Sequence, residues 1–565
     1  MKKLRWQLMI IFLTGLVVGI LLLSEQPGNL QSLSPEPARG GTYVEALTGN
    51  LQRLNPVLDF YNSVDRDVDR LIFSGLIRFD ERGVPQPDLA ESWGISRDGM
   101  IYNFALRPNI KWHDGEPLTS DDVLFTVDLL REGGDVVPAD LQSFWKDIEV
   151  IALDQNNIQF RLPEPFAPFL DYLSFGVLPR HLLGDMDFQE IVNAPFNIQP
   201  VGTGPYRFDR LIIENDQIQG VVLSVFDQYY GARKPYIEQI IFRYYPDSSA
   251  ALAAYRQGEV EGIGNVTTDI LSEVLNEPDL AVYTGRKPEI TFVFLNLDNP
   301  QVAFFKDRAV RKALLIGLNR QWIIDRLLNG QAILANGPIL PGTWAYYDGI
   351  KPVRYDMQAA VENLKQNGYV ITAEGSSIRE KDGIALSFKL VHPQDELYTA
   401  IAQSIQSDWA KLGVQVELEP LPYEELINGR LVPRDYQAAL VALNLTRSPD
   451  PDPYPFWDQA QATGGQNYSQ WDNRTASEYL EEARVTTDLA ERARLYRNFQ
   501  LVFEEETPAL PLFSPVYTCA ISREVQGVSV GPLFDSSDRF STIMNWYLIA
   551  RVPSRQDTAP TASGQ

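Results

Sequence analysis

The sequence predicts an α/β protein of two or three domains, and three observations lead to this prediction. The chain has 565 residues, more than a single hydrophobic core can organise. Hydrophobic residues make up 44% of it and charged residues 22%, as in globular proteins. Short runs with strand periodicity alternate with amphipathic helical stretches along the chain, and this interleaving is typical of α/β folds.

The N-terminus carries an export signal. Lys2, Lys3 and Arg5 precede an uncharged apolar run from Trp6 to Leu23. The run is close to the ~20 residues that span a bilayer, and no clear cleavage site follows it. We therefore expect residues 6–23 to remain as a membrane anchor, with cleavage as the alternative, and the rest of the chain to be extracytoplasmic. Ser24 stands where a lipoprotein would need Cys, which argues against a lipoprotein.

The strand and helix signals are clearest in six segments. The period-two alternation of a half-buried strand occurs at 158–162 and 384–390. Helical patterns occupy 309–328, 356–367, 399–411 and 476–506. Gly368 and Gly413 follow the second and third of these helices, where glycine is favoured as a C-terminal cap, and Pro508 ends the fourth.

The charge and cysteine content exclude several classes of protein. The formal net charge is −25, so the surface repels nucleic acid and anionic lipid headgroups. Cys519 is the single cysteine, which excludes an intrachain disulfide and predicts a buried apolar side chain.

No catalytic, metal or cofactor site is predicted. The run from Asp65 to Asp69 has the carboxylate spacing of a calcium loop, but Arg70 and Leu76 stand where such a loop needs Gly and Glu. The three His residues are far apart in the sequence, which disfavours a zinc site, and we expect His113 to belong to a turn. No nucleophile elbow, phosphate loop or dinucleotide-binding glycine motif occurs.

An ordered series of segments resembles the family-5 extracellular solute-binding proteins, which include the dipeptide- and oligopeptide-binding proteins of ABC importers. Each segment is weakly specific alone, but the ordered set covers nearly all of residues 40–549. The segments are GGTY at 40–43, LNP at 54–56, LIFSGL at 71–76, PDLAESW at 87–93, IKWHDGEPLTSDDV at 110–123, GTGPY at 202–206, VRKAL at 310–314, Asn319-Arg320, Gly337-Pro338, Tyr355-Asp356 and DPDPY at 450–454.

The resemblance implies a periplasmic-binding-protein-like, two-lobed α/β fold with a third, smaller domain. Members of the family close their lobes around a small molecule or oligopeptide and deliver it to the permease subunits of an ABC transporter, without catalysis. We expect a monomer with the following parts: an N-terminal segment and linker at 1–37, a discontinuous domain I at 38–75, 200–290 and 505–550, domain II at 76–199, domain III at 291–504 and a disordered tail at 551–565.

The sequence departs from the peptide-binding pattern of the family at one point. In peptide-binding members, an Asp in domain III binds the ammonium group of the ligand, three residues before an acidic-Pro pair and three after a Trp. Alignment on Asp450-Pro451 places Arg447 and Asn444 at these positions, alignment on Asp452-Pro453 places Pro449 and Thr446 there, and neither restores the Asp or the Trp. An Arg would repel an ammonium group and could hold a carboxylate or phosphate. Asp450 or Asp452 could replace the missing Asp if the loop is re-routed, or both could be surface turn residues.

The resemblance implies further ligand-binding candidates. Asn265 stands where peptide binders place a ligand-contacting Asn, and Phe294 and Asn296 lie near the expected crossover into domain III. Tyr454 and Trp457 could form aromatic walls, although packing in the core explains each aromatic equally well. A peptide-like solute is our first hypothesis. An oligosaccharide, opine-like compound or chelated metal in the same fold is the second, and an extracellular hydrolase is the third.

Overall fold

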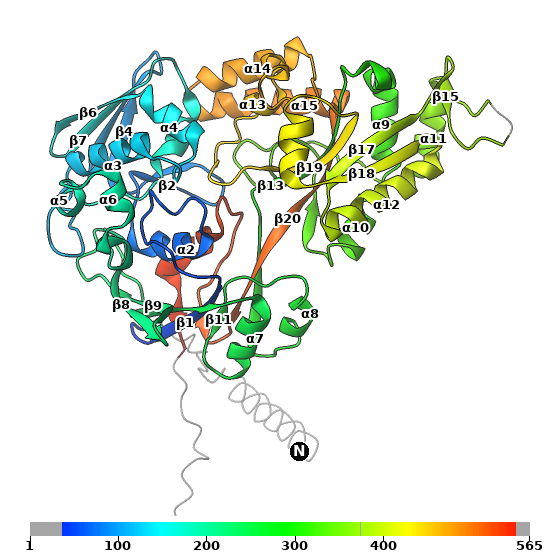
Figure 1. Ribbon diagram of the computed structural model, residues 1–565. Helices are drawn as coiled ribbons and strands as arrows, with labels where there is room; N and C mark the ends of the chain where they lie inside the picture. The colour runs from blue at the N-terminus through cyan, green and yellow to red at the C-terminus, as the bar shows by residue number, and fades with distance from the viewer. Residues whose placement is uncertain (1–36, 373–374, 550–565) are drawn as a thin grey trace, which may run out of the picture.

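The computed structural model describes residues 37–372 and 375–549. The predicted anchor at 6–23, most of the linker and the tail at 551–565 lie outside the described residues. Within the described part, no helix combines the length and the apolar character needed to cross a membrane. Two lobes are visible in Figure 1, with the long strand β20 (Ala509–Ser522) running from one to the other.

One mixed sheet passes through both lobes. It has 12 strands in the described residues, ordered β18-β17-β19-β13-β20-β11-β1-β10-β9-β8, with β12 and β14 also paired to β20. The first lobe contributes β1 (Thr42–Thr48), β8 (Tyr206–Glu214), β9 (Gln217–Val225), β10 (Gln239–Tyr245), β11 (Gly262–Ile263) and β12 (Leu280–Arg286). The second lobe contributes β13 (Glu289–Leu295), β14 (Ala332–Leu334), β17 (Ser387–Pro393), β18 (Gln415–Leu421) and β19 (Ala438–Asn444).

The lobes are joined at two adjacent chain crossings. The chain leaves the first lobe between β12 and β13, at Lys287 and Pro288, and returns within β20. One half of β20 pairs with β13 and β14, and the other half pairs with β12, so that Arg286 lies opposite Val516. Lys287 N donates to Pro515 O at 2.9 Å, which ties the two crossings together. Two adjacent crossings of this kind are typical of proteins whose lobes rotate, and we refer to them as the hinge.

The second lobe, residues 289–514, packs helices against its strands. Two expected helices are confirmed: Asp356 accepts a hydrogen bond from Ala359 N at the start of α11, and Gly413, at φ 87°, ends α12. Its smaller elements are β15 (Glu380–Lys381), β16 (Ile384–Ala385), η3 (Pro300–Lys306), η4 (Glu425–Leu431), η5 (Gln459–Ala462) and α13 (Tyr454–Trp457), and its longer helices are α9 (Arg308–Ile316), α10 (Arg320–Arg326), α11 (Met357–Gln366), α12 (Glu396–Leu412), α14 (Arg474–Val485) and α15 (Leu489–Glu506).

Three predicted boundaries in this lobe were wrong. The expected helix at 309–328 is two helices, because Asn319 accepts a hydrogen bond from Trp322 N and begins α10. The expected helix at 476–506 is likewise α14 and α15, since Asp488 caps α15. The expected strand at 384–390 is β16 and β17, separated at Leu386.

The first lobe, residues 37–286 and 516–549, also carries a small antiparallel sheet in the order β4-β5-β7-β6. The predicted strand at 158–162 is its β7, shifted by one residue. The strands of this sheet are β4 (Ala90–Ile95), β5 (Ile101–Leu106), β6 (Glu149–Asp154) and β7 (Asn157–Arg161). The elements around it are β2 (Ile77–Phe79), β3 (Pro85–Pro87), α3 (Ser120–Glu132), α4 (Ala139–Lys146), α5 (Arg180–Leu183), α6 (Phe188–Val192), η1 (Ala167–Leu173) and η2 (Pro195–Ile198). The rest of the lobe holds α2 (Ser63–Ile72), α7 (Ser248–Arg256), α8 (Leu271–Val274), β21 (Val525–Gln526), η6 (Ser536–Asn545) and β22 (Tyr547–Leu548).

The segment at 202–205 re-enters the first lobe against the end of α2. Gly204 N donates to Ile72 O at 2.7 Å, and a side chain at Gly202 would collide with the same carbonyl oxygen. His113 packs here too: its Nδ1 accepts from Gly202 N at 3.2 Å, and its Nε2 lies 3.1 Å from Gly204 O. Burial lowers the pKa of His113 to about 4. His113 is therefore a structural residue of this turn.

A buried charge cluster fixes β1, α2 and η6 to each other. The Arg539 side chain is fully buried and forms ion pairs with Glu45 at 2.7 Å and Asp67 at 2.6 Å. Burial raises the pKa of Asp67 to about 6, although Arg539 opposes the shift. A buried guanidinium shared by two carboxylates is costly to break, because removal of one partner leaves uncompensated charge in the core.

Replacement of Arg539 by Met should therefore lower the free energy of unfolding by about 3–5 kcal/mol. Urea denaturation of the full-length chain checks this. Arg494→Met is the control, because Arg494 pairs with Glu491 at the surface, where their side chains are 46% and 41% exposed. The control should leave the unfolding transition unchanged. Equal effects of both variants would contradict a structural role for the buried cluster.

Candidate ligand-binding site

A cavity of about 1560 Å³ lies between the lobes. The first lobe lines it with α2, the segment at 73–82, the region around η1 and parts of 529–545, and the second lobe lines it with the loop that follows β19. This loop, residues 444–452, is where the sequence departs from the peptide-binding pattern. The cavity is therefore bounded by elements on both sides of the hinge.

Arg447 extends from the loop to the first lobe. Its Nη2 donates to Asp59 Oδ1 at 2.7 Å, and its guanidinium lies over the ring of Phe60 at 4.8 Å. Its backbone has φ 62°, and its N–H donates to Phe534 O at 2.8 Å. Asn444 accepts from Thr446 N at 2.9 Å and so shapes the start of the loop. Arg447 thus makes an ion pair across the cavity.

Asp450 and Asp452 hold the far end of the loop. Both oxygens of Asp450 accept from the buried Arg492, and Asp450 N donates to Asp171 Oδ2 in the first lobe at 2.8 Å. Asp452 pairs with Arg484 at 3.3 Å. Burial raises the pKa of Asp452 to about 6. Because each carboxylate already has an arginine partner, these two residues anchor the loop.

Two carboxylates of the first lobe lie beside the single guanidinium of Arg447. The Asp59 side chain is 5% exposed, and Arg447 is its ion-pair partner. Asp69 is 3% exposed and forms no ion pair within the described residues. Burial raises the pKa of Asp69 well above its ordinary value, and the charges of Asp59 and Asp65 raise it further, whereas a hydrogen bond from the backbone N–H of Asn55 lowers it. Asp59 thus has Arg447 as its cation partner, and burial favours the protonated form of Asp69.

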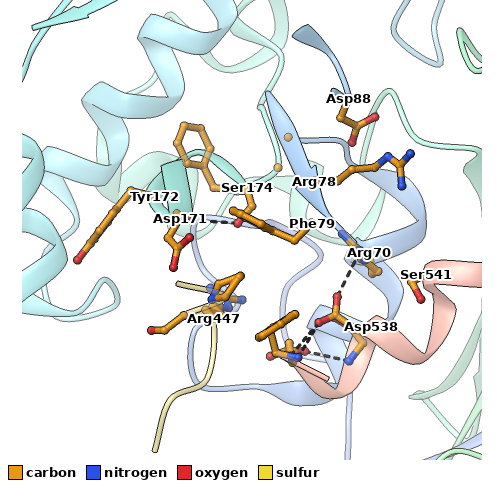
Figure 2. A pocket seen from close by; sticks show the side chains of 18 of the residues that line it. Arg70, Arg78, Phe79, Asp88, Asp171, Tyr172, Ser174, Arg447, Asp538 and Ser541 are labelled. Carbon is orange, nitrogen blue, oxygen red and sulfur yellow. Dashed lines mark hydrogen bonds and ion pairs between the residues drawn. The ribbon is translucent and has the colours of Figure 1, made fainter. Parts of the chain in front are cut away.

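The nearby arginines of α2 are paired with other carboxylates. Arg66 pairs with Asp535 at 2.9 Å, and Arg70 pairs with Asp538 at 3.2 Å. The Arg70–Asp538 pair is drawn in Figure 2. Both guanidinium groups are therefore paired with carboxylates at the start of η6, Asp535 and Asp538.

The end of the cavity farther from Arg447 is lined by Asp88 and several arginines. Asp88 accepts a hydrogen bond from Tyr230, and burial raises its pKa, while Tyr230 and the charges of Arg70, Arg78 and Arg107 lower it. Figure 2 shows Arg78 and Asp88 on the side of the view away from Arg447, Asp171 and Tyr172. The cavity thus offers charges of both signs together with aromatic surfaces.

The structure brings together four of the nine predicted site residues. Asn444, Arg447, Asp450 and Asp452 line the cavity. The other five do not, and each has a partner elsewhere. Phe294 stacks on Trp457 at 5.8 Å in the core, Asn296 donates to Tyr436 O at 2.9 Å, the Tyr454 ring lies under Arg484 at 4.4 Å, and the backbone carbonyl of the half-buried Asn265 accepts from Ser248 Oγ at 2.9 Å.

Sequence reasoning missed Asp59, Phe60 and Asp69. The acidic run at 65–69, which resembles a calcium loop, is part of α2. Asp65 and Asp69 are four residues apart on one helical face, and both are buried. An acidic face on a buried helix is a detectable signal, but the sequence does not show which group it meets. No group of three or more metal-ligating side chains is arranged around a common point in the described part of the chain.

Comparison with known proteins finds a protein family whose model matches most of the chain. The model of the bacterial extracellular solute-binding proteins, family 5 Middle, matches residues 84–494. The oligopeptide-binding protein AppA of Bacillus subtilis is 27% identical over 568 residues, covering 97% of this chain and 100% of AppA. The dipeptide-binding protein of Escherichia coli is 27% identical over 515 residues, covering 87% of this chain and 92% of the relative.

Two solved structures are similar over most of the chain. AppA from Bacillus subtilis in complex with a nonapeptide has a TM-score of 0.63 at 25% identity, covering 91% of this chain and 100% of AppA. NikZ from Campylobacter jejuni in complex with Ni(L-His) has a TM-score of 0.64 at 27% identity, covering 90% of this chain and 99% of NikZ.

The buried carboxylate of Asp69 predicts a pH-dependent stability, because burial raises its pKa. Because its pKa is raised on folding, the folded chain keeps a proton that the unfolded chain loses above pH ~4. Stability contributed by this group therefore falls as the pH rises from about 4 through the raised pKa. Without added solute, Asp69→Asn should raise the melting temperature at pH 7 more than at pH 4.

Thermal unfolding at the two pH values checks this prediction. Asp216→Asn, which makes the same charge change on the exposed turn after β8, should move the melting temperature at neither pH. A decrease of the same size at both pH values in Asp69→Asn would show that Asp69 makes a stabilising hydrogen bond.

Proposed function

Because the chain belongs to the family-5 bacterial extracellular solute-binding proteins, we propose that it is the receptor of an ABC importer for a peptide-like solute. The observation that carries the proposal is the cavity between two lobes that are joined by two adjacent crossings. Rotation about such a hinge brings the loop at 444–452 and α2 together around a solute. Closure excludes water, which strengthens polar contacts to the solute.

The size and lining of the cavity support a peptide-like solute. Its volume of about 1560 Å³ exceeds the roughly 300–1,000 Å³ typical of small-molecule pockets. Charges of both signs suit the two termini of a peptide, and aromatic rings such as Phe60, Phe79 and Tyr172 offer surfaces for side chains. The names of the relatives AppA and the dipeptide-binding protein point to the same class of solute.

A chelated metal or another anionic solute is the second candidate. Arg78 favours it, because this exposed guanidinium lines the cavity and makes no hydrogen bond or ion pair within the residues described. The similarity to NikZ, which was solved with Ni(L-His), favours it too. The family consists of solute-binding receptors, and we propose no catalytic activity for this chain.

We also propose how the chain is placed and divided. It acts outside the cytoplasm as a monomer, tethered by residues 6–23, and passes its solute to permease subunits. The proposed domains are domain I at 38–75, 200–290 and 505–550, domain II at 76–199 and domain III at 291–504, although the first half of β20 pairs with strands of the second lobe. In support of this division, both hinge crossings lie within about ten residues of the boundaries of domain III.

Solutes that bind the folded protein should raise its melting temperature. A hundredfold excess over the Kd stabilises it by about 2.7 kcal/mol. We expect an enzymatic hydrolysate of casein to raise the melting temperature of the full-length chain, and maltotriose and nickel–histidine to leave it unchanged. A rise with one of the latter two alone would retain the receptor and exclude the peptide. No rise with any of the three would contradict the proposal.

A further inference from the structure

The ion pair between Arg447 and Asp59 marks a cation site on the first lobe. We propose that Asp59, supported by Asp69 and the ring of Phe60, binds the terminal ammonium group of the solute in the position that the guanidinium of Arg447 occupies in the structure. The inference rests on the proposed function and adds which group of the peptide is recognised, and by which lobe.

The carboxylate is the fixed half of this pair. Asp59 O accepts from Arg66 Nη1 at 3.1 Å and from Asn62 N at 3.1 Å, so the backbone beneath the carboxylate is held. The Asp59 side chain is 5% exposed, whereas that of Arg447 is 37% exposed. The guanidinium therefore reaches Asp59 from the cavity side and can turn back into the cavity when another cation replaces it.

The surroundings of Asp59 suit a second positive charge. Asp69 is 3% exposed and has no ion-pair partner within the described residues. Arg66 and Arg70, the cations of the same helix, are bound to Asp535 and Asp538. Burial of a carboxylate without an ion-pair partner is unfavourable, and a cation placed near it offsets that cost.

The aromatic ring beside Asp59 is a second element of the site. Arg447 lies over Phe60 at 4.8 Å from the ring centre, within the range of cation–π attraction. A carboxylate next to a ring face attracts any cation of suitable size, including a primary ammonium group. The ammonium is therefore recognised by the first lobe, whereas the pattern of peptide-binding members places this recognition on the loop at 444–452 of the second lobe.

The test compares two forms of one probe on the full-length chain. The probe is an enzymatic hydrolysate of casein, used either untreated or acetylated on its amines with acetic anhydride. The concentration that gives half of the maximal rise in melting temperature reports the apparent affinity. We expect untreated peptides to bind the wild-type chain about 10-fold or more tightly than acetylated peptides, as for loss of a charged hydrogen bond.

Three variants locate the preference. Asp59→Asn should reduce the affinity for untreated peptides to that for acetylated peptides, and Asp69→Asn should reduce it in the same direction. Asp216→Asn, a matched charge change on the exposed turn after β8, should behave as the wild-type chain does. The comparison of the two probes on the wild-type chain requires no variant, so it decides even if a variant does not fold.

The outcomes separate the two proposals. If neither probe raises the melting temperature, the peptide function is wrong, and this inference is wrong with it. If both probes act equally on the wild-type chain, the function stands and recognition of the ammonium is refuted. If Asp59→Asn keeps the full preference for untreated peptides, another residue binds the ammonium and the assignment to Asp59 is refuted.

Discussion

The whole arrangement depends on β20, a single strand that belongs to both lobes. Its first half pairs with β13 and β14, and its second half pairs with β11 and β12. The continuous sheet that results fixes the two chain crossings side by side, at 287–288 and near Pro515. Other contacts between the lobes include the packing of α14 against η1 and the hydrogen bond from Trp344 N to Arg82 O at 2.9 Å. The cavity is lined by residues of both lobes.

Buried arginines determine which of these contacts are rigid. Arg539 links α2 to β1 and η6 through its ion pairs, and so fixes the position of the cavity wall that contains Asp59 and Asp69. Arg492 holds Asp450 and thereby the far end of the loop. Arg447 differs from both, because its side chain is partly open to the cavity and its partner belongs to the other lobe. A charged contact of this kind is well suited to exchange with a charged solute.

Local signals in the sequence predicted the elements better than the site. Asp356 and Gly413 mark helix ends through interactions within a few residues, and the structure confirms both. The breaks at Asn319 and Asp488 were missed, because the hydrophobic pattern continues across each cap. Asp59 was missed for a different reason, since its partner Arg447 is 388 residues away in the sequence. Phe294 and Trp457 were predicted to line the ligand site, but their side chains are buried in the core.

Movement of the lobes about the hinge is the central claim, and energy transfer between dyes tests it most directly. Cysteines introduced at Asn156 in the turn after β6 and at Asp382 in the turn after β15 place one dye on each lobe. Cys519 is 1% exposed, and burial raises its pKa to about 12, so it should stay unlabelled. The account predicts that a casein hydrolysate increases the transfer efficiency over the same concentrations that raise the melting temperature. A rise in melting temperature with unchanged transfer would contradict closure of the lobes around the solute.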